Sequence, residues 1–523
     1  MGALTLIILR RTLAHSHSRQ DFNVNHLERA ITFAVAVAVL AGEPRAFADT
    51  NDAAGVDLKE LGARADRGEA AAEFDLGWRY YRGDGVSQDL AAAVSWLSKA
   101  AEQGNAKAQY CLGSMYLDGQ GVPRNPDEAA KWLRKAADQD FIGAQYNLAR
   151  MYLKGEGVGK NAPEAAQLFR QAAEHGYGKA QFALGVLYQN SEGVAKDPVE
   201  AVKWLRKAAE QNIPEAQYAV AEAYHFGNGV DKDGRETLNW LQKAAAQGLA
   251  IAQYNLGVVY ATGEGAPSGA AALGDAYFVT EGVVWNPGEA EKWWRQAAGQ
   301  GLAAAQFALG VMYFNGLGVP EDQPAAARWY RQAAEQGYLK AEVNLSAMYL
   351  KGKGVSKDGV EAARWLQKAA VQGDVKAETG LGLMYADGVD VKKDSAAAAG
   401  WLRKAAERGM PMAQTALGRL YFQGEGVPKD LNEAANWFAK AAAQGDAEGQ
   451  YRLGGMYANG ESVAKDYLTA YKWADLAAQN GFLDAVRLRS YLEKHMNRSQ
   501  IDEALRLSQQ FRPQITAIPE SAP

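Results

Sequence analysis

The side chains that most often do chemistry in proteins are scarce in this sequence. Its 523 residues include six histidines and one cysteine, Cys111, and three of the histidines lie within the first 26 residues. A single cysteine excludes an intramolecular disulfide and a metal site built from several cysteines. The remaining histidines, His175, His225 and His495, have no partners at the spacing of a zinc site or of a Ser-His-Asp triad. We therefore expect no catalytic residue, no metal site and no cofactor.

Two recurring patterns resemble active-site motifs without meeting their requirements. G-x-G pairs recur, as at Gly119 and Gly121, but neither a Lys-Ser/Thr pair nor a preceding strand pattern accompanies them, as a phosphate-binding loop requires. Acidic side chains also recur three positions apart, as at Asp430 and Glu433, where they could act as paired acids in hydrolysis. Capping of a helix explains this spacing better, because a side-chain oxygen there accepts from free backbone N–H groups. The sequence thus favours a protein that is not an enzyme.

Both patterns belong to an internal repeat with a period of 36 residues. The triplet at Ala108-Gln109-Tyr110 returns at this spacing, and eleven complete units and a shorter twelfth can be aligned. Ala108, Leu112 and Tyr116 fall on one helical stripe, which predicts a first helix, and the Tyr116 position is Tyr in all eleven units. A Gly-rich turn and an Asp or Asn at the Asn125 position then precede a second helix. Neighbouring hairpins must stack, because one hairpin cannot bury its own apolar face.

The second helix has two further periodic positions. It ends at Gly104 and its equivalents, and only Asp140 and Asn212 replace this glycine, both being residue types that tolerate the left-handed conformation. Ten of the thirteen tryptophans share one position, which predicts that they pack in the core: Trp96, Trp132, Trp204, Trp240, Trp293, Trp329, Trp365, Trp401, Trp437 and Trp473. A small residue such as Gly113 lets the two helices of a hairpin approach closely.

The combination of A-x-x-x-L-G-x-x-Y, G-x-G-V, an Asx cap and A-x-x-W-x-x-K-A-A-x-x-G resembles the Sel-1-like repeat family, which is related to tetratricopeptide repeats. The resemblance covers roughly residues 57–511. It implies an all-α, right-handed α/α solenoid of about twelve hairpins and a role as an interaction scaffold or adaptor. Many bacterial relatives are exported, and some regulate signalling, exopolysaccharide or envelope processes. Unlike the cysteine-rich members, this chain must hold each hairpin by packing alone.

The repeat pattern also divides the chain. We expect a capping helix within residues 49–68, eleven repeats over 69–484, a capping hairpin over 485–511 and a disordered tail over 512–523, with Ser499 as the cap of the last helix. The spacing from Ala252 to Ala305 exceeds the 36-residue period by 17 residues. Within it the pair Leu256-Gly257 recurs as Leu273-Gly274. We expect residues 251–261 to form the stacked helix and a 17-residue insertion around 266–282 to bulge out.

The N-terminus indicates export. Residues 31–41 form an apolar run too short to span a bilayer, and Ala46-Phe47-Ala48 follows as a small-x-small cleavage site. Residues 1–48 are therefore expected to be a signal peptide, which leaves Asp49 as the first residue of a periplasmic or secreted protein without a membrane anchor. The long stretch before the run leaves two alternatives, a start near Val24 or an uncleaved anchor.

The remaining candidates for function lie on the surface. The net charge of −5 argues against nucleic acid as a partner, and a protein partner is expected, with the oligomeric state left open. In tetratricopeptide-like solenoids the first helices line a concave groove, where positions such as Ser114, Leu117 and Asp118 should vary between repeats. The groove candidates are Trp78, Tyr81, Arg150, Lys154, Glu222, Phe226, Phe314, Arg419 and Phe422. Aromatic and Arg side chains dominate binding energy at interfaces, although a solvated face could also vary in this way.

These observations favour a scaffold or adaptor of the bacterial envelope that binds a protein partner in the groove. The alternative is a binder of cell-wall or exopolysaccharide fragments, with the groove aromatics as stacking platforms.

Overall fold

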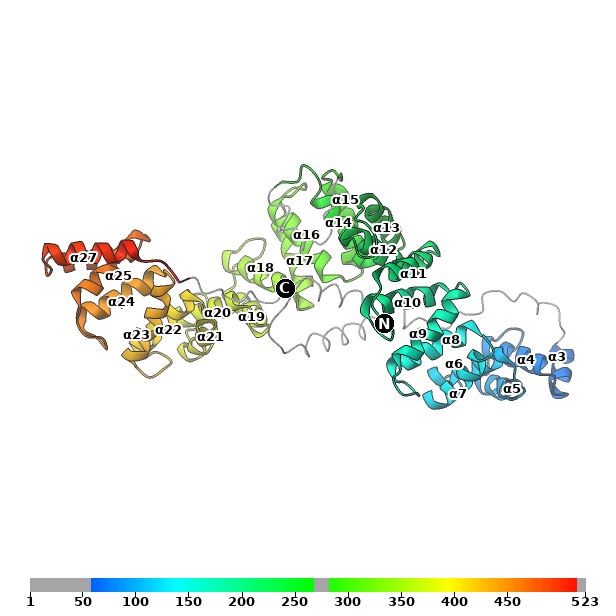
Figure 1. Ribbon diagram of the computed structural model, residues 1–523. Helices are drawn as coiled ribbons and strands as arrows, with labels where there is room; N and C mark the ends of the chain where they lie inside the picture. Colours follow the sequence, from blue (N-terminus) through cyan, green and yellow to red (C-terminus); the bar gives the residue numbers. More distant parts are fainter. Residues whose placement is uncertain (1–57, 268–281, 515–523) are drawn as a thin grey trace. The chain divides into compact units, whose positions relative to one another are not determined.

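The computed structural model describes residues 58–267 and 282–514, and the 25 helices among them confirm an all-α repeat fold (Figure 1). They form two compact units, and one isolated parallel bridge joins Glu264 to Val284 in the first. The helices of the first unit are α3 (Leu58–Asp66), α4 (Ala70–Arg82), α5 (Leu90–Glu102), α6 (Ala106–Asp118), α7 (Pro126–Ala137), α8 (Ile142–Lys154), α9 (Ala162–Glu174), α10 (Gly178–Asn190), α11 (Pro198–Glu210), α12 (Pro214–Phe226), α13 (Gly234–Ala246) and α14 (Ala250–Ala261). The helices of the second unit are α15 (Pro287–Gly299), α16 (Ala303–Asn315), α17 (Gln323–Glu335), α18 (Leu339–Lys351), α19 (Gly359–Val371), α20 (Val375–Asp387), α21 (Ser395–Glu407), α22 (Pro411–Gln423), α23 (Leu431–Ala443), α24 (Ala447–Asn459), α25 (Tyr467–Gln479), α26 (Leu483–Glu493) and α27 (Arg498–Gln510).

The helix boundaries follow the periodic residues. Even-numbered helices are the first helices of the repeats, and α5 to α25 with odd numbers are the second helices. Asn125 caps α7, where its side chain accepts from the backbone N–H of Glu128 at 3.2 Å. After α6, Gly119 adopts a left-handed φ of 72° and its N–H donates to the Met115 carbonyl. Asp140 and Asn212 have φ values of 59° and 61°, which confirms that they replace the glycine in a left-handed position.

The core forms where the two helices of a hairpin cross. A Cβ added to Gly113 of α6 would lie 2.8 Å from Cγ of Leu133 of α7, so a larger residue would force this leucine to shift, and other repeats place small residues such as Ala149 here. Ala129 and Ala136 of α7 are fully buried. The hairpins are therefore held by small residues at the crossing and larger apolar ones around it.

The tryptophans of the second helices are less uniformly buried than their period predicts. Trp204, Trp240, Trp365 and Trp437 are buried, but the other six of the series are only partly so. A lysine three residues later covers the ring in most repeats, as Lys368 does with its Nζ 4.0 Å from the Trp365 ring centroid. The series thus lies at the edge of the core, where a cation shields the outer face of each ring.

The tyrosine at the end of several first helices links neighbouring hairpins. Nη2 of Arg403, on α21, donates to the hydroxyl of Tyr421, on α22, at 2.9 Å, and the guanidinium lies over the ring. The same pair joins Arg134 to Tyr152, Arg170 to Tyr188, Arg295 to Tyr313 and Arg331 to Tyr349. The repeated Tyr is thus part of the frame.

The first unit begins with α3, which packs against α4 and buries Leu61 and Ala65. At its other end α14 covers Ala250–Ala261 and packs against α13. The expectation that this helix is the stacked first helix of its repeat stays a prediction. The N–H of Glu264 donates to the Val283 carbonyl at 2.7 Å, and the N–H of Trp285 donates to the Glu264 carbonyl at 3.0 Å. The two ends of the expected insertion therefore meet, while most of its residues, 268–281, lie outside the described residues.

The C-terminus packs back onto the last repeats. The last helix, α27, contacts α25, and Oγ of Ser508 donates to Oδ2 of Asp475 at 2.7 Å (Figure 1). Its cap is Asn497, which forms a capping box with Gln500, so the expectation that Ser499 caps it was wrong. Of the tail, residues 512–514 are described and the N–H of Gln514 donates to the Ala443 carbonyl, whereas residues 515–523 lie outside the described part.

Candidate binding surface on the first helices

The first helices lie on the inner side of the stack in the second unit. Here α20 contacts α22, α22 contacts α24 and α24 contacts α26, in addition to the contacts within and between successive hairpins. Like helices approach one another most closely on the inner side of a curved stack. We call the surface formed by the varying positions of the first helices, taken in each unit by itself, the inner face; these contacts place it on the inner side in the second unit.

Some polar positions of the first helices serve the frame. Nε2 of Gln109 donates to the Ala101 carbonyl at the end of the preceding hairpin, at 3.0 Å. Oε1 of Gln109 accepts from Nε2 of Gln139 in its own hairpin, at 2.7 Å. Both bonds recur at Gln181, Gln217, Gln414 and, with Asn480 as donor, Gln450. This glutamine chain is buried and explains why Gln recurs beside the helix crossing.

The two aromatic candidates on α4 contact each other. The rings of Trp78 and Tyr81 stack with centroids 5.2 Å apart, and Phe74 stacks on Trp78 at 6.4 Å. The Tyr81 hydroxyl donates to Oε1 of Gln120 in the next repeat at 2.8 Å. Both side chains are partly buried, so they offer ring edges more than open faces to a ligand.

On α8, the cationic candidates Arg150 and Lys154 lie one turn apart on the same side of the helix. Arg150 is partly buried, its guanidinium lies 5.8 Å from the Tyr146 ring centroid, and its Nε has no hydrogen-bond partner within the described residues. Lys154 is exposed. Desolvation, and then the positive charges of Arg150 and Arg124, lower the pKa of Lys154. A positive charge thus accumulates on this part of the inner face.

The two candidates on α12, Glu222 and Phe226, differ in their exposure to solvent. Glu222 is only 8% exposed, so this carboxylate lies inside the packing and a partner could not reach it without a rearrangement. We expected an open surface here, whereas Glu222 is buried, as are Ser114, Val186 and Val258 at the same position of other repeats. Phe226 is partly exposed and its ring meets the edge of His225 at 4.6 Å.

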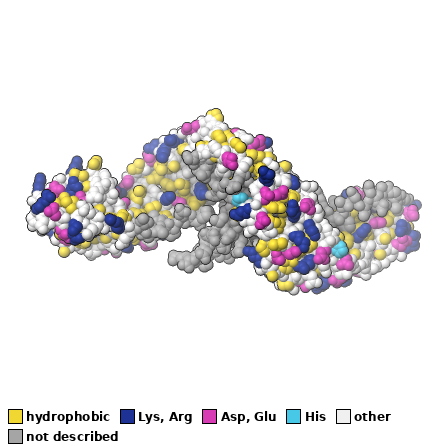
Figure 2. All heavy atoms as spheres, turned by 45° about the horizontal axis from the view of Figure 1, so that its top comes forward, with side chains coloured by type: hydrophobic (Ala, Val, Ile, Leu, Met, Phe, Trp, Pro, Cys, Tyr) yellow, Lys and Arg dark blue, Asp and Glu magenta, His cyan; other side chains and the backbone are white. Residues whose placement is uncertain are grey.

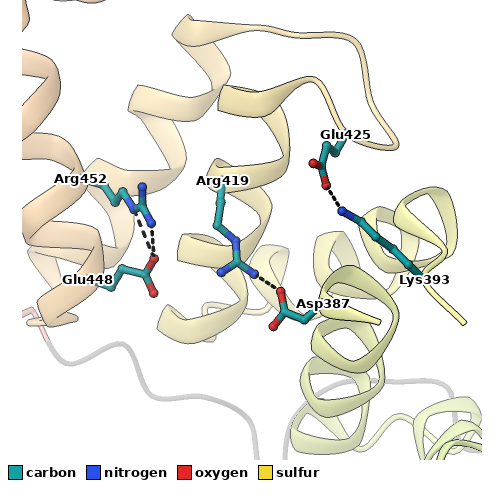
Figure 3. A network of polar contacts seen from close by, with 6 residues as sticks. All are labelled: Asp387, Lys393, Arg419, Glu425, Glu448 and Arg452. Atoms are coloured by element: carbon teal, nitrogen blue, oxygen red, sulfur yellow. Dashed lines mark hydrogen bonds and ion pairs between the residues drawn. The ribbon is translucent and has the colours of Figure 1, made fainter. Parts of the chain in front are cut away.

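In the second unit, Arg419 of α22 forms an ion pair with Asp387 of α20, with Nη2 and Oδ1 2.8 Å apart (Figure 3). Lys393 and Glu425 form a second link between the same two repeats at 2.7 Å. Arg419 is therefore engaged in the frame, which the sequence did not predict. The spacing could have revealed these links between repeats, because the residues of both pairs are 32 positions apart, as are Arg124 and Glu156 in the first unit.

Phe314 and Phe422 remain partly exposed on the inner face of the second unit. The Phe314 ring lies 6.5 Å from Tyr330, with Nζ of Lys353 5.6 Å from its centroid. Phe422 packs against the apolar cluster that contains Leu453 and Met456. Both can add apolar contact area for a partner.

Further observations concern the surface charge, metal ligands, membrane-spanning helices and the single cysteine. Figure 2 shows Lys and Arg side chains interspersed with Asp and Glu over the face that it draws, without the one-sign stripe of a nucleic-acid binder. In residues 58–267 and 282–514, no group of three His, Cys, Asp or Glu side chains could hold a metal ion, and no helix has the length and apolar character to span a membrane. Cys111 is a buried free thiol, and burial raises its pKa.

The fold and its repeated contacts define an α/α repeat protein. The Sel1 repeat model matches residues 70–105, 106–141, 142–177, 178–213, 214–249, 250–269, 267–302, 303–338, 339–374, 375–410, 411–446 and 447–482. The chain therefore belongs to the Sel1 repeat family. The model divides the long step of the repeat into a partial match, 250–269, and a complete one, 267–302.

Two solved structures illustrate the relationship. The chain is 36% identical to c5321 of uropathogenic Escherichia coli, described as a protective antigen displaying an SLR fold, over 87% of this chain and 94% of that one, with a TM-score of 0.65. It is 32% identical to a Sel1 repeat protein from Oxalobacter formigenes, over 67% of this chain and 99% of that one, with a TM-score of 0.49. A comparison with curated proteins found no match.

Proposed function

We propose that this chain is a non-enzymatic scaffold that binds a protein partner on the inner face of its first helices. The proposal is supported by a difference between two sets of positions on each first helix. Positions such as Gln109 and Tyr116 repeat and are used by the frame, whereas the positions of Lys154, Phe226, Phe314 and Phe422 vary and keep exposed atoms. A periodic frame with a varied, accessible surface suits recognition of an extended partner.

Binding of cell-wall or exopolysaccharide fragments has less support. That function would need open aromatic faces on which sugar rings could stack. Trp78 and Tyr81, the aromatic pair nearest to such a platform, stack on each other instead.

The protein is proposed to act in the periplasm or outside the cell, after cleavage between Ala48 and Asp49. The small-x-small site after the apolar run supports this location, as does a relative described as a protective antigen. N-terminal sequencing of the natively expressed protein should give Asp49 as its first residue. A sequence that includes residues before Ala46 would reject cleavage and favour the uncleaved anchor.

The binding face can be tested by site-specific photo-crosslinking in the native envelope. A photoreactive residue is placed at Lys154 or Phe422 on the inner face and, as matched controls, at Lys131 or Arg364 on exposed positions of second helices. The inner positions should capture the same partner protein, identified by mass spectrometry, and the control positions should not. Equal capture from both sets of positions would contradict the proposal.

A further inference from the structure

Two arginines occupy the same position in their repeats but have different surroundings. Arg150 of α8 and Arg419 of α22 each follow an aspartate by 32 residues, at Asp118 and Asp387. Arg419 and Asp387 form an ion pair at 2.8 Å. Within the described residues, Arg150 forms no such pair with Asp118, and its Nε is buried without a hydrogen-bond partner. The same two residue types at the same spacing therefore leave one guanidinium in an ion pair and the other without one.

The charges around Arg150 favour an external anion. Lys154 follows it by one turn, whereas Gln423 holds the equivalent place after Arg419. Arg124, the third cation nearby, already pairs with Glu156. Desolvation raises the pKa of Asp118 despite the attraction of Arg150 and Arg124, so this carboxylate is only weakly stabilised by its neighbours. Arg150 and Lys154 thus lie close together, and neither forms an ion pair within the described residues.

Arg150 is also held in a defined orientation. Its guanidinium lies over the Tyr146 ring, and Tyr146 contacts Tyr177 with ring centroids 5.2 Å apart. Packing against an aromatic ring reduces the side-chain freedom that binding would otherwise remove. A fixed guanidinium with an ammonium one turn away matches a carboxylate, which accepts two hydrogen bonds in one plane.

We propose that Arg150 and Lys154 bind side-chain carboxylates of an acidic segment of the protein partner. The inference rests on the proposed scaffold function and assigns this part of the inner face its ligand chemistry. The unpaired Arg150, set against the paired Arg419, is the observation that carries it.

The test measures fluorescence anisotropy of a labelled Glu-rich peptide and of its Gln-for-Glu counterpart with the full chain. The Glu-rich peptide should bind more tightly, and R150Q and K154Q should each weaken it about tenfold or more, since hydrogen bonds between charged groups are lost. R419Q is the matched control and should change binding less than twofold. D118N should strengthen binding, because it removes the competing carboxylate.

Three results would overturn the proposal: equal affinity for both peptides, an equal loss in R419Q, or binding of a phosphopeptide without binding of the Glu-rich peptide. Circular dichroism and urea unfolding of R150Q and K154Q must match those of the parent, which separates lost recognition from lost folding. Capture by photo-crosslinking from the inner face that persists in R150Q and K154Q would leave the scaffold function standing and reject carboxylate recognition alone. Peptide binding at Arg150 without any partner captured from the inner face would instead support carboxylate recognition and reject the scaffold function.

Discussion

Oε2 of Glu342 accepts a hydrogen bond from Nε2 of Gln372 at 2.8 Å, at a place where most repeats have a glutamine of the buried glutamine chain. The equivalent Gln414 also donates, through its Nε2, to the carbonyl of Ala406 at 3.1 Å. An ionised carboxylate cannot donate. Glu342, which is only 2% exposed, thus breaks the chain of hydrogen bonds unless it carries a proton.

This carboxyl should make the stability of the second unit depend on pH. Burial raises the pKa of Glu342 to about 7, against the hydrogen bond from Gln372 and the positive charge of Lys368. Because the folded protein holds this proton more tightly than the unfolded chain, the stabilisation is complete below about pH 4.5 and is lost as the pH rises to about 7. We expect a loss of roughly 1–3 kcal/mol between pH 5 and pH 8. E342Q should remove it, raising the unfolding free energy at pH 8 and leaving it nearly unchanged at pH 5.

Urea unfolding at both pH values, with hydrogen exchange of the α18 and α19 amides, checks this prediction. E378Q is the matched control, because Glu378 occupies the next equivalent position but forms an ion pair with Arg408 at 3.4 Å. Burial also raises the pKa of Glu378, but the positive charges of Arg408 and Lys404 oppose this shift, so E378Q should give a smaller gain at pH 8 than E342Q. An equal effect of E342Q at both pH values would show that Glu342 does not titrate in this range.

The tryptophans at the core edge should differ in their contribution to stability. Trp365 is 5% exposed, so W365A should lower the unfolding free energy by about 3–5 kcal/mol, as expected for loss of a packed aromatic side chain. Trp132 is only partly buried, and W132A should cost less because more of its ring already meets water. Urea denaturation of both variants measures the difference. A loss below about 1 kcal/mol for W365A would place its ring outside the core.

Capping should account for the Asp or Asn that begins each second helix. Oδ1 of Asp430 accepts from the backbone N–H groups of Asn432 and Glu433, at 2.9 and 3.0 Å. D430A should lower the unfolding free energy by about 0.5–2 kcal/mol, whereas D430N keeps an acceptor and should cost less. Thermal unfolding of the two variants checks the prediction. Equal losses would mean that charge, and not the cap, is what this position requires.

Structural features that depend only on neighbouring residues of the same repeat could be predicted from the sequence. The cap at Asn125 and the left-handed Asp140 follow from local backbone chemistry, and both were found where expected. The link from Asp387 to Arg419 depends on how two successive repeats are placed, which no single repeat encodes. Arg150 illustrates this limit, because the same spacing there gives no such pair.

The long step of the repeat gives a further prediction. Deleting residues 266–282 restores the 36-residue period, and the hydrogen bonds that join Glu264 to Val283 and Trp285 show that the two ends already meet. We expect the melting temperature of the deletion variant to stay within a few degrees of the parent. The Sel1 repeat model, however, matches 267–302 as a complete repeat, and this match would predict a loss of stability on deletion. A collapse of cooperative unfolding would assign the segment to the packed stack.

The return of α27 across α25 limits how such an array can lengthen. Ser508 binds Asp475, and the N–H of Gln514 reaches the Ala443 carbonyl, so the last segment occupies the flank of repeats that precede it. A hairpin appended after this segment would therefore begin on the flank of earlier repeats and not next to α26. A hairpin inserted between two interior repeats would meet matching surfaces on both sides. Growth by duplication is therefore easier to accommodate between interior repeats than after α27.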